Sequence, residues 1–234
     1  MKVLIWDFDG TLAYRVGGAW TATLVEVLQQ ELPGCAITLA DLRPYTRSGF
    51  PWHTPEIPHP HLSSPDAWWG ALEETFQRAY RGVGLHDEVA ERLSKLVRAT
   101  YLRPDRWVRF DDVLPTLAAL SAQGWTHVLL SNHVPELRDL LVSLELASYF
   151  VCVYNSAESG YEKPHPQAFA DVLRAFEDAE TLWMIGDGYY ADVCGAQAVG
   201  IPAILVRRPH PEVRHYAESL AEVMTIVGGG MRMG

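Results

Sequence analysis

Short runs of apolar residues recur along the chain, and most are separated by segments with helical spacing. Five runs rich in β-branched residues predict buried strands, over residues 2–6, 126–131, 149–154, 181–187 and 202–208. Helix-like stretches lie between most of them, at 134–146, 165–177 and 189–199. Continuous apolar strands that alternate with helices are typical of a parallel sheet covered on both faces. We therefore expect an α/β fold with a doubly wound, mostly parallel, Rossmann-like sheet.

The alternation fails between about residues 15 and 105. This stretch contains helix-like segments at 19–32, 66–82 and 86–101, but no convincing strand. Six of the fifteen prolines lie between Pro44 and Pro65, which predicts a turn-rich loop.

One helical face of this stretch carries large apolar side chains four residues apart, namely Trp68, Leu72, Phe76 and Tyr80. We interpret these aromatic residues, with Trp69, as packing residues and not as a cofactor site. The expected organisation is an α/β core (1–14 and 106–227), an inserted helical domain (15–105) and a disordered tail (228–234).

Composition limits the classes of function. Of the 234 residues, 48% are hydrophobic and 21% are charged, as in ordinary soluble globular proteins, and the formal net charge is −10. This charge disfavours nucleic acid or an anionic membrane as the main partner, although it allows a small anionic substrate. The chain starts with no signal peptide and has no stretch of about 20 apolar residues, so we expect a cytoplasmic protein. We expect it to be a monomer or a homodimer. Its three cysteines show no metal-ligand spacing, which fits a reducing compartment.

Polar residues that could take part in catalysis or metal binding follow the predicted strands. Asp7-Phe8-Asp9-Gly10-Thr11 follows the first strand, and Ser131-Asn132 ends the second. Lys163 precedes a helix in GYEKPHPQAF, and Asp187 and Asp192 lie in GDGYYADV. In parallel sheets ligands bind at the carboxyl ends of the strands, where these motifs are expected to meet.

The set DFDGTL, SN, KP-x-P and GDGYYAD, in this order and over nearly the whole chain, resembles the haloacid dehalogenase-like hydrolase superfamily. The resemblance is to the phosphatases that carry a helical cap between the first and second motifs. It implies a Mg²⁺-dependent phosphatase acting on a small phosphorylated metabolite.

The resemblance also implies roles for individual residues. Asp7 would be the nucleophile that forms an aspartyl-phosphate, and Asp9 the general acid and base. Asp7 and Asp187, with the backbone carbonyl of Asp9, would bind Mg²⁺, and Asp192 would orient the metal site. Further implied residues are Ser131 and Lys163 for the phosphoryl oxygens, and Thr11 and Asn132 for substrate binding.

The carboxylate at Asp9 favours phosphate ester chemistry, since dehalogenases of the superfamily lack it. A phosphomutase and a non-catalytic binding protein with the same fold remain alternatives.

The loop WHTPEIPHPH holds His53, His59 and His61, but this spacing fits no usual zinc site. By family architecture the loop would contribute substrate contacts, with His53 and Arg47 as candidates. Arg15 and His133 lie beside motifs and are candidates for the entrance of the site, while His133 could equally point to solvent at a helix start.

Overall fold

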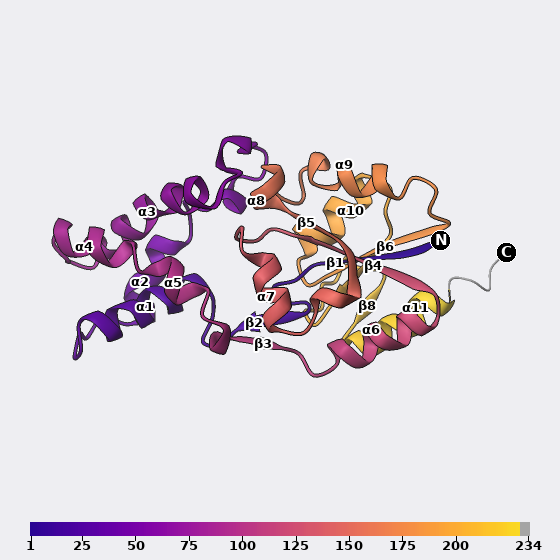
Figure 1. Ribbon diagram of the computed structural model, residues 1–234, viewed down its shortest axis with the longest axis horizontal. Coiled ribbons are helices and arrows are strands. Elements are labelled where there is room, and N and C mark those ends of the chain that lie inside the picture. The colour runs from indigo at the N-terminus through magenta and orange to yellow at the C-terminus, as the bar shows by residue number, and fades with distance from the viewer. Residues whose placement is uncertain (230–234) are drawn as a thin grey trace.

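The computed structural model describes residues 1–229 and is built around a six-stranded sheet (Figure 1). The strand order is β5-β4-β1-β6-β7-β8, and every neighbouring pair is parallel. The strands are β1 (Lys2–Trp6), β4 (Trp125–Ser131), β5 (Phe150–Asn155), β6 (Thr181–Gly186), β7 (Ala203–Val206) and β8 (Tyr216–Ala217). The predicted α/β sheet is confirmed, with β8 as an additional short edge strand.

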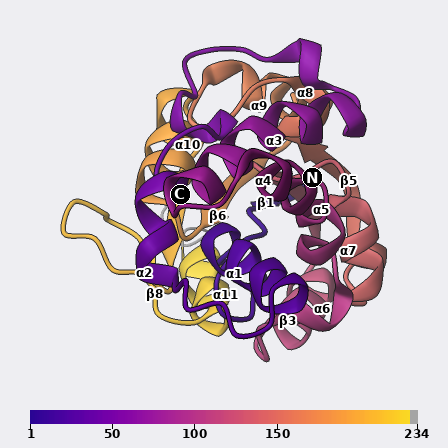
Figure 2. The ribbon, with the colours of Figure 1, turned by 90° about the vertical axis from the view of Figure 1, so that its left-hand side faces the viewer.

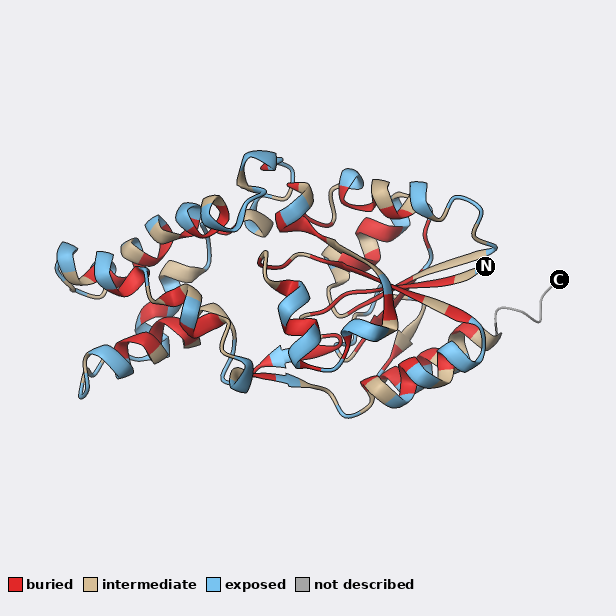
Figure 3. Ribbon diagram, in the orientation of Figure 1, coloured by how far each residue is buried: buried red, intermediate tan, exposed pale blue. Residues whose placement is uncertain are grey.

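Alternate residues of each central strand pack into two separate cores. In β1, Leu4 and Trp6 face one core, whereas Val3 and Ile5 face the other. The first core is completed by α6 (Val113–Ala122), α7 (Leu137–Ser143) and α11 (Leu220–Gly229). The second is completed by α9 (Pro166–Ala175) and α10 (Gly195–Ala198). Both faces of the sheet are therefore covered, as Figure 3 shows by the buried strands between partly exposed helices.

Helices α6 and α11 were not predicted from the pattern. Helix α11 includes residues 228 and 229, so the prediction of a disordered tail is wrong for these two, and the other residues of that tail lie outside the described range. The predicted helix at 189–199 consists of two different helical segments. Residues Tyr189–Cys194 form a π-helix that leads into α10. A four-residue helix, α8 (Ser156–Ser159), follows β5.

The stretch from residue 16 to residue 106 contains five α-helices, at the end of the molecule toward which β1 runs (Figures 1 and 2). They are α1 (Trp20–Glu31), α2 (Leu39–Leu42), α3 (Pro65–Gly82), α4 (Asp87–Ser94) and α5 (Val97–Tyr101). The expected helix at 86–101 is interrupted between α4 and α5. The proline-rich loop contains three short 3₁₀ turns, Arg43–Thr46, Pro51–His53 and Pro60–Leu62. The predicted apolar face of α3 is buried, including Trp68 and Phe76.

The chain passes from the sheet to these helices and back through the two strands of an antiparallel ribbon. Strand β2 (Ala13–Arg15) leaves the sheet and β3 (Trp107–Arg109) returns to it. Arg15 is buried and forms an ion pair of 2.8 Å with Glu26 of α1. Among residues 1–229, no helix combines the length and the apolar character that a membrane crossing requires.

An ion pair joins three elements near the carboxyl end of β7. Arg207, directly after β7, donates to both carboxylate oxygens of Asp112, at 2.7 and 3.2 Å. Asp112 also accepts a hydrogen bond of 2.9 Å from the backbone N–H of Leu220 at the start of α11. Burial raises the pKa of Asp112, but these hydrogen bonds outweigh burial and leave the pKa below its ordinary value.

Candidate active site

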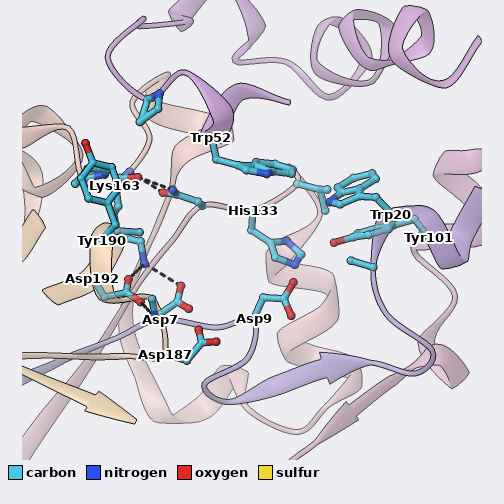
Figure 4. A pocket seen from close by; sticks show the side chains of 17 residues that line it. Asp7, Asp9, Trp20, Trp52, Tyr101, His133, Lys163, Asp187, Tyr190 and Asp192 are labelled. Carbon is cyan, nitrogen blue, oxygen red and sulfur yellow. Dashed lines mark hydrogen bonds and ion pairs between the residues drawn. The ribbon is translucent and has the colours of Figure 1, made fainter. Parts of the chain in front are cut away.

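Asp7 lies at the carboxyl end of the central strand and is the focus of a buried polar cluster (Figure 4). Its backbone N–H donates to the carbonyl of Ile185, which continues the pairing of β1 with β6. Oδ1 of Asp7 accepts hydrogen bonds from Ser131 Oγ at 2.9 Å and from Lys163 Nζ at 2.8 Å. Because β1, β4 and β6 are adjacent and parallel, their carboxyl ends bring these residues together.

Lys163 is buried and has a partner for each of its three ammonium hydrogens. Nζ lies 2.8 Å from Asp7 Oδ1, 2.6 Å from Asp192 Oδ1 and 2.8 Å from the carbonyl oxygen of Leu130. Burial alone would lower the pKa of Lys163, but Asp192 and Asp7 outweigh it and raise the pKa. Lys163 therefore carries a positive charge at neutral pH.

Asn132 positions the segment that carries Lys163. Its amide nitrogen donates to the Lys163 carbonyl at 2.9 Å, and its amide oxygen accepts from the Lys163 N–H at 2.8 Å. The side chain lines the cavity, but both of its polar atoms are occupied by backbone.

Asp192 is held from two sides inside the π-helix. Its Oδ1 accepts from Lys163, and its Oδ2 accepts from the backbone N–H of Gly188 at 2.9 Å. A Cβ on Gly186 would lie 2.1 Å from Asp192 Oδ2, so this position in the GDG motif has no room for a side chain. Burial raises the pKa of Asp192 to about 6, and the charge of Lys163 opposes this shift.

Asp187 completes a group of three carboxylates. One oxygen atom each from Asp7, Asp187 and Asp192 lies within 4.8 Å of the other two. Burial, followed by repulsion from Asp7, raises the pKa of Asp187 to about 7. Clustered carboxylates of this kind need a cation to remain ionised together.

Two residues of the first motif make room for Asp187 and hold it. Thr11 Oγ1 accepts a hydrogen bond of 3.0 Å from the Asp187 N–H and is fully buried. Thr11 is not among the residues that line the cavity, so the structure gives it this supporting contact. Gly10 has φ = +82°, and a Cβ there would lie 2.4 Å from Asp187 Oδ2.

Asp9 lies across the cavity from the Lys163 ion pairs (Figure 4). Burial, followed by the nearby charge of Asp7, raises the pKa of Asp9 to about 7. A carboxyl group with this pKa can donate and accept a proton near neutral pH, which suits general acid and base chemistry.

His133 is buried and lines the same cavity, so the interpretation of a solvent-facing side chain is wrong. Its ring packs edge-on against Phe8 at 5.1 Å between centroids and lies 5.4 Å from Trp107. Neither ring nitrogen has a hydrogen-bond partner within residues 1–229. Burial lowers the pKa of His133 to about 4, so the imidazole is neutral at pH 7.

The cavity measures about 490 Å³, and one part of its wall is aromatic. Trp20, Trp52 and Tyr101 form this part, Tyr190 lines the cavity beside Lys163 (Figure 4), and none of the four was predicted as a site residue. They come from α1, the proline-rich loop, α5 and the π-helix, and no local spacing in the sequence connects these segments.

Several other candidates lie elsewhere. Arg47 and His53 are exposed and line a separate cavity of about 480 Å³, so the structure does not bring them to the carboxylates. Arg15 is held by Glu26 and by backbone carbonyls, away from the entrance. Within residues 1–229, His53, His59 and His61 belong to no cluster of side chains that could bind a metal ion.

His59 instead joins the proline-rich loop to the segment between α8 and α9. Its ring nitrogen Nε2 lies 3.0 Å from Glu162 Oε1 in a buried contact. Its backbone N–H donates to the carbonyl of Gly160 at 2.8 Å. Glu162 directly precedes Lys163, so the loop is attached to the segment that carries the lysine.

Comparisons with known proteins agree with this geometry. The family model of the haloacid dehalogenase-like hydrolases matches residues 1–200. This chain belongs to that family. As a hydrolase of this family, it shares 27% identity over 216 residues with haloacid dehalogenase-like hydrolase domain-containing protein 3 of Bos taurus, over 90% of this chain and 84% of the bovine protein.

One further protein is similar to this hydrolase in sequence, and another is similar to it in fold. The phosphoserine phosphatase of Thermus thermophilus is 35% identical over 152 residues, which cover 64% of this chain and 60% of that enzyme. The solved structure of the HAD-hydrolase YfnB of Bacillus subtilis superposes with a TM-score of 0.71 at 17% identity, over 97% of this chain and 98% of YfnB. That second likeness concerns the fold of the hydrolase.

Proposed function

We propose that this protein is a Mg²⁺-dependent phosphatase that hydrolyses a small phosphorylated metabolite through an aspartyl-phosphate intermediate. The observation that carries the proposal is the arrangement around Asp7, whose carboxylate is paired with Lys163 at 2.8 Å and faces a cavity that Asp9 also lines. The relationship to a phosphoserine phosphatase supports it.

The residues present fit a magnesium ion. Both oxygens of Asp192 already accept hydrogen bonds, whereas Asp7 Oδ2 has only a long contact of 3.5 Å from Thr11. Asp7 and Asp187, with the backbone carbonyl of Asp9, would hold the ion, in keeping with the preference of Mg²⁺ for a few carboxylates and substrate oxygens. When bound, the ion supplies positive charge that stabilises the transferring phosphoryl group. YfnB, the structural neighbour, was solved with magnesium.

The reaction would proceed in two displacements. The Asp7 carboxylate attacks phosphorus, the bond from phosphorus to the leaving oxygen breaks, and the Asp9 carboxyl gives its proton to that oxygen. A water molecule then loses a proton to Asp9 and attacks phosphorus, which breaks the bond to Asp7 and releases inorganic phosphate.

Ser131 and Lys163 would stabilise charge on the phosphoryl oxygens during both steps. Each donates a hydrogen bond to Asp7 Oδ1, so each has a donor directed at the carboxylate to which phosphorus becomes bonded. Helices α1–α5, within residues 15–105, would act as a cap that excludes water from the cavity.

The test is phosphate release from p-nitrophenyl phosphate and a panel of metabolite phosphates. We expect turnover by the wild type with Mg²⁺, none with a chelator, and none by Asp7→Asn. Asp9→Asn should lose about 10²- to 10⁴-fold in kcat and keep its Mg²⁺ affinity by calorimetry, because its carbonyl is unchanged.

Two results would contradict the mechanism. Phosphoenzyme trapped on a residue other than Asp7 would remove the assigned nucleophile. Isomerised sugar phosphate without free phosphate would indicate a mutase.

A further inference from the structure

The cavity has two chemically different ends (Figure 4). Asp7, Asp187, Asp192 and Lys163 gather at one end, and Trp20, Trp52 and Tyr101 at the other, with Asp9 and His133 between them. In the proposed mechanism phosphorus is bonded to Asp7 and the leaving oxygen receives its proton from Asp9. The leaving group therefore extends past Asp9 toward the aromatic side chains.

The aromatic end is built from the half-buried rings of Trp20 and Trp52 and the buried ring of Tyr101, all of which line the cavity. Trp20 stacks on Tyr101 with 4.3 Å between ring centroids and an interplanar angle of 12°. Trp52 lies 5.6 Å from Trp20. Trp68 and Trp69 of the same cluster are buried and do not line the cavity, whereas Trp20 and Trp52 are partly exposed there. Indole faces of this kind stack well with flat aromatic ligands.

The aromatic end of the cavity has no cationic side chain among its described lining residues that could pair with a second acidic group of the substrate. Within the described residues, the lining of the cavity includes Lys163 but no other lysine and no arginine. The proposed mechanism assigns Lys163 to the phosphoryl oxygens at the other end of the cavity, so it does not serve a second acidic group here. Arg208 lies outside the lining, where it pairs with Asp187 at 3.2 Å.

His133 supplies polar recognition without charge. Its imidazole is buried, lines the cavity and leaves both ring nitrogens without partners inside residues 1–229. A neutral imidazole offers one donor and one acceptor, which can pair with a heteroatom or a hydroxyl of the leaving group. A buried polar group without a partner is costly, so a ligand that satisfies it gains affinity.

We infer that the substrate is a phosphate monoester whose leaving alcohol carries a flat aromatic ring and no second acidic group. This inference rests on the proposed phosphatase function. The volume of about 490 Å³ accommodates such a leaving group. The expected substrate differs in class from phosphoserine, whose leaving group is small and bears a carboxylate.

The experiment compares substrates that differ in the ring alone. In adenosine 5′-monophosphate and ribose 5-phosphate the leaving oxygen is the primary 5′-oxygen. Benzyl and propyl phosphate form a second pair, without a nucleobase. We expect kcat/KM to favour the ring-bearing member of at least one pair by about tenfold or more. The first pair reports recognition of a nucleobase and the second that of a plain aryl group. Phosphoserine should be the poorest substrate.

Trp52→Leu should lower the ring preference at least about threefold, because it removes one stacking surface. Trp183→Leu is the matched control, since Trp183 is also half-buried but lines a different cavity with Lys2 and Trp125. A variant that merely loses stability would lose activity on both members of a pair and leave their ratio unchanged.

The outcomes separate the two proposals. Asp7-dependent hydrolysis without ring preference, or with phosphoserine preferred, would overturn the substrate class and leave the phosphatase intact. If no ester is hydrolysed, the phosphatase proposal fails, and calorimetric binding of adenosine 5′-monophosphate against ribose 5-phosphate decides the aromatic site. Binding about tenfold tighter for the nucleotide would support it, and equal binding would overturn it.

Discussion

His59 Nε2 and Glu162 Oε1 lie 3.0 Å apart in a buried contact, and they connect the proline-rich loop to the residue before Lys163. His59→Ala would leave the Glu162 carboxyl buried without this partner. We expect a loss of about 1–3 kcal/mol in the free energy of unfolding, measured in denaturant, together with a lower kcat/KM. His61→Ala is the control, because His61 is exposed on the same loop. Equal effects of both substitutions would show that the contact does not stabilise the loop.

Gly10 of the first motif lies directly against the carboxylate of Asp187 in the last motif. Gly10→Ala would place a Cβ 2.4 Å from Asp187 Oδ2 and would also strain the backbone at φ = +82°. We expect Mg²⁺ affinity, measured by calorimetry, to fall at least about tenfold. Gly124→Ala separates the two effects, since Gly124 has φ = +80° and no atom within 4 Å of the added Cβ. That control should cost about 1 kcal/mol in unfolding free energy and keep normal Mg²⁺ affinity.

Arg208 places a positive charge 3.2 Å from a carboxylate assigned to magnesium. Arg208→Ala should strengthen Mg²⁺ binding by about two- to fivefold, because it removes competition and repulsion. The arginine side chain is 76% exposed, which keeps the effect small. Arg174 is equally exposed and pairs with Asp171, so Arg174→Ala is the matched control and should leave the affinity unchanged. Weaker Mg²⁺ binding by Arg208→Ala would show that the arginine supports the carboxylate.

The contacts of Asp112 predict a pH dependence of stability. Since its pKa is lower in the folded protein than in the unfolded chain, ionised Asp112 stabilises the fold above its unfolded pKa of about 3.9. This contribution is lost as the pH falls through the lower, folded value. Asp112→Asn should therefore cost about 1–3 kcal/mol at pH 7, and its difference from wild type should shrink below about pH 4.

The neighbouring Asp111→Asn serves as the control for this measurement. Asp111 is exposed and receives no side-chain hydrogen bond within residues 1–229. Its substitution should leave the unfolding free energy nearly unchanged at both pH values. A constant deficit of Asp112→Asn across the pH range would contradict ionisation as the source of the stabilisation.

The carboxylate cluster could be predicted from the sequence because its position follows from strand geometry. Ser131 ends an apolar run, and Asp7 and Asp187 each directly follow one, so a parallel sheet alone places them at one edge. Their detailed roles, including the bonds of Thr11 and Asn132 to backbone, depend on side-chain directions that periodicity does not contain.

The aromatic end and the burial of His133 could not be predicted in the same way. Trp20, Trp52 and Tyr101 meet through packing of segments with no common spacing, and Phe8 and Trp107 enclose His133 from both sides of the insertion. Helix α6 was missed because it is apolar around much of its circumference and contains a proline in its first turn.

The central position of β1 has a consequence for how the chain reaches its native state. Lys2 pairs with Trp125 on one side and with Thr181 on the other, so both neighbours of β1 come from far along the chain. Contacts so distant in sequence slow folding, whereas α1–α5 can pack through closer ones. A fragment that ends before β6 leaves one edge of β1 unpaired and Asp7 without the Ile185 carbonyl that anchors its N–H. Asp7 therefore acquires its final surroundings only when strands that are far apart in the sequence have paired.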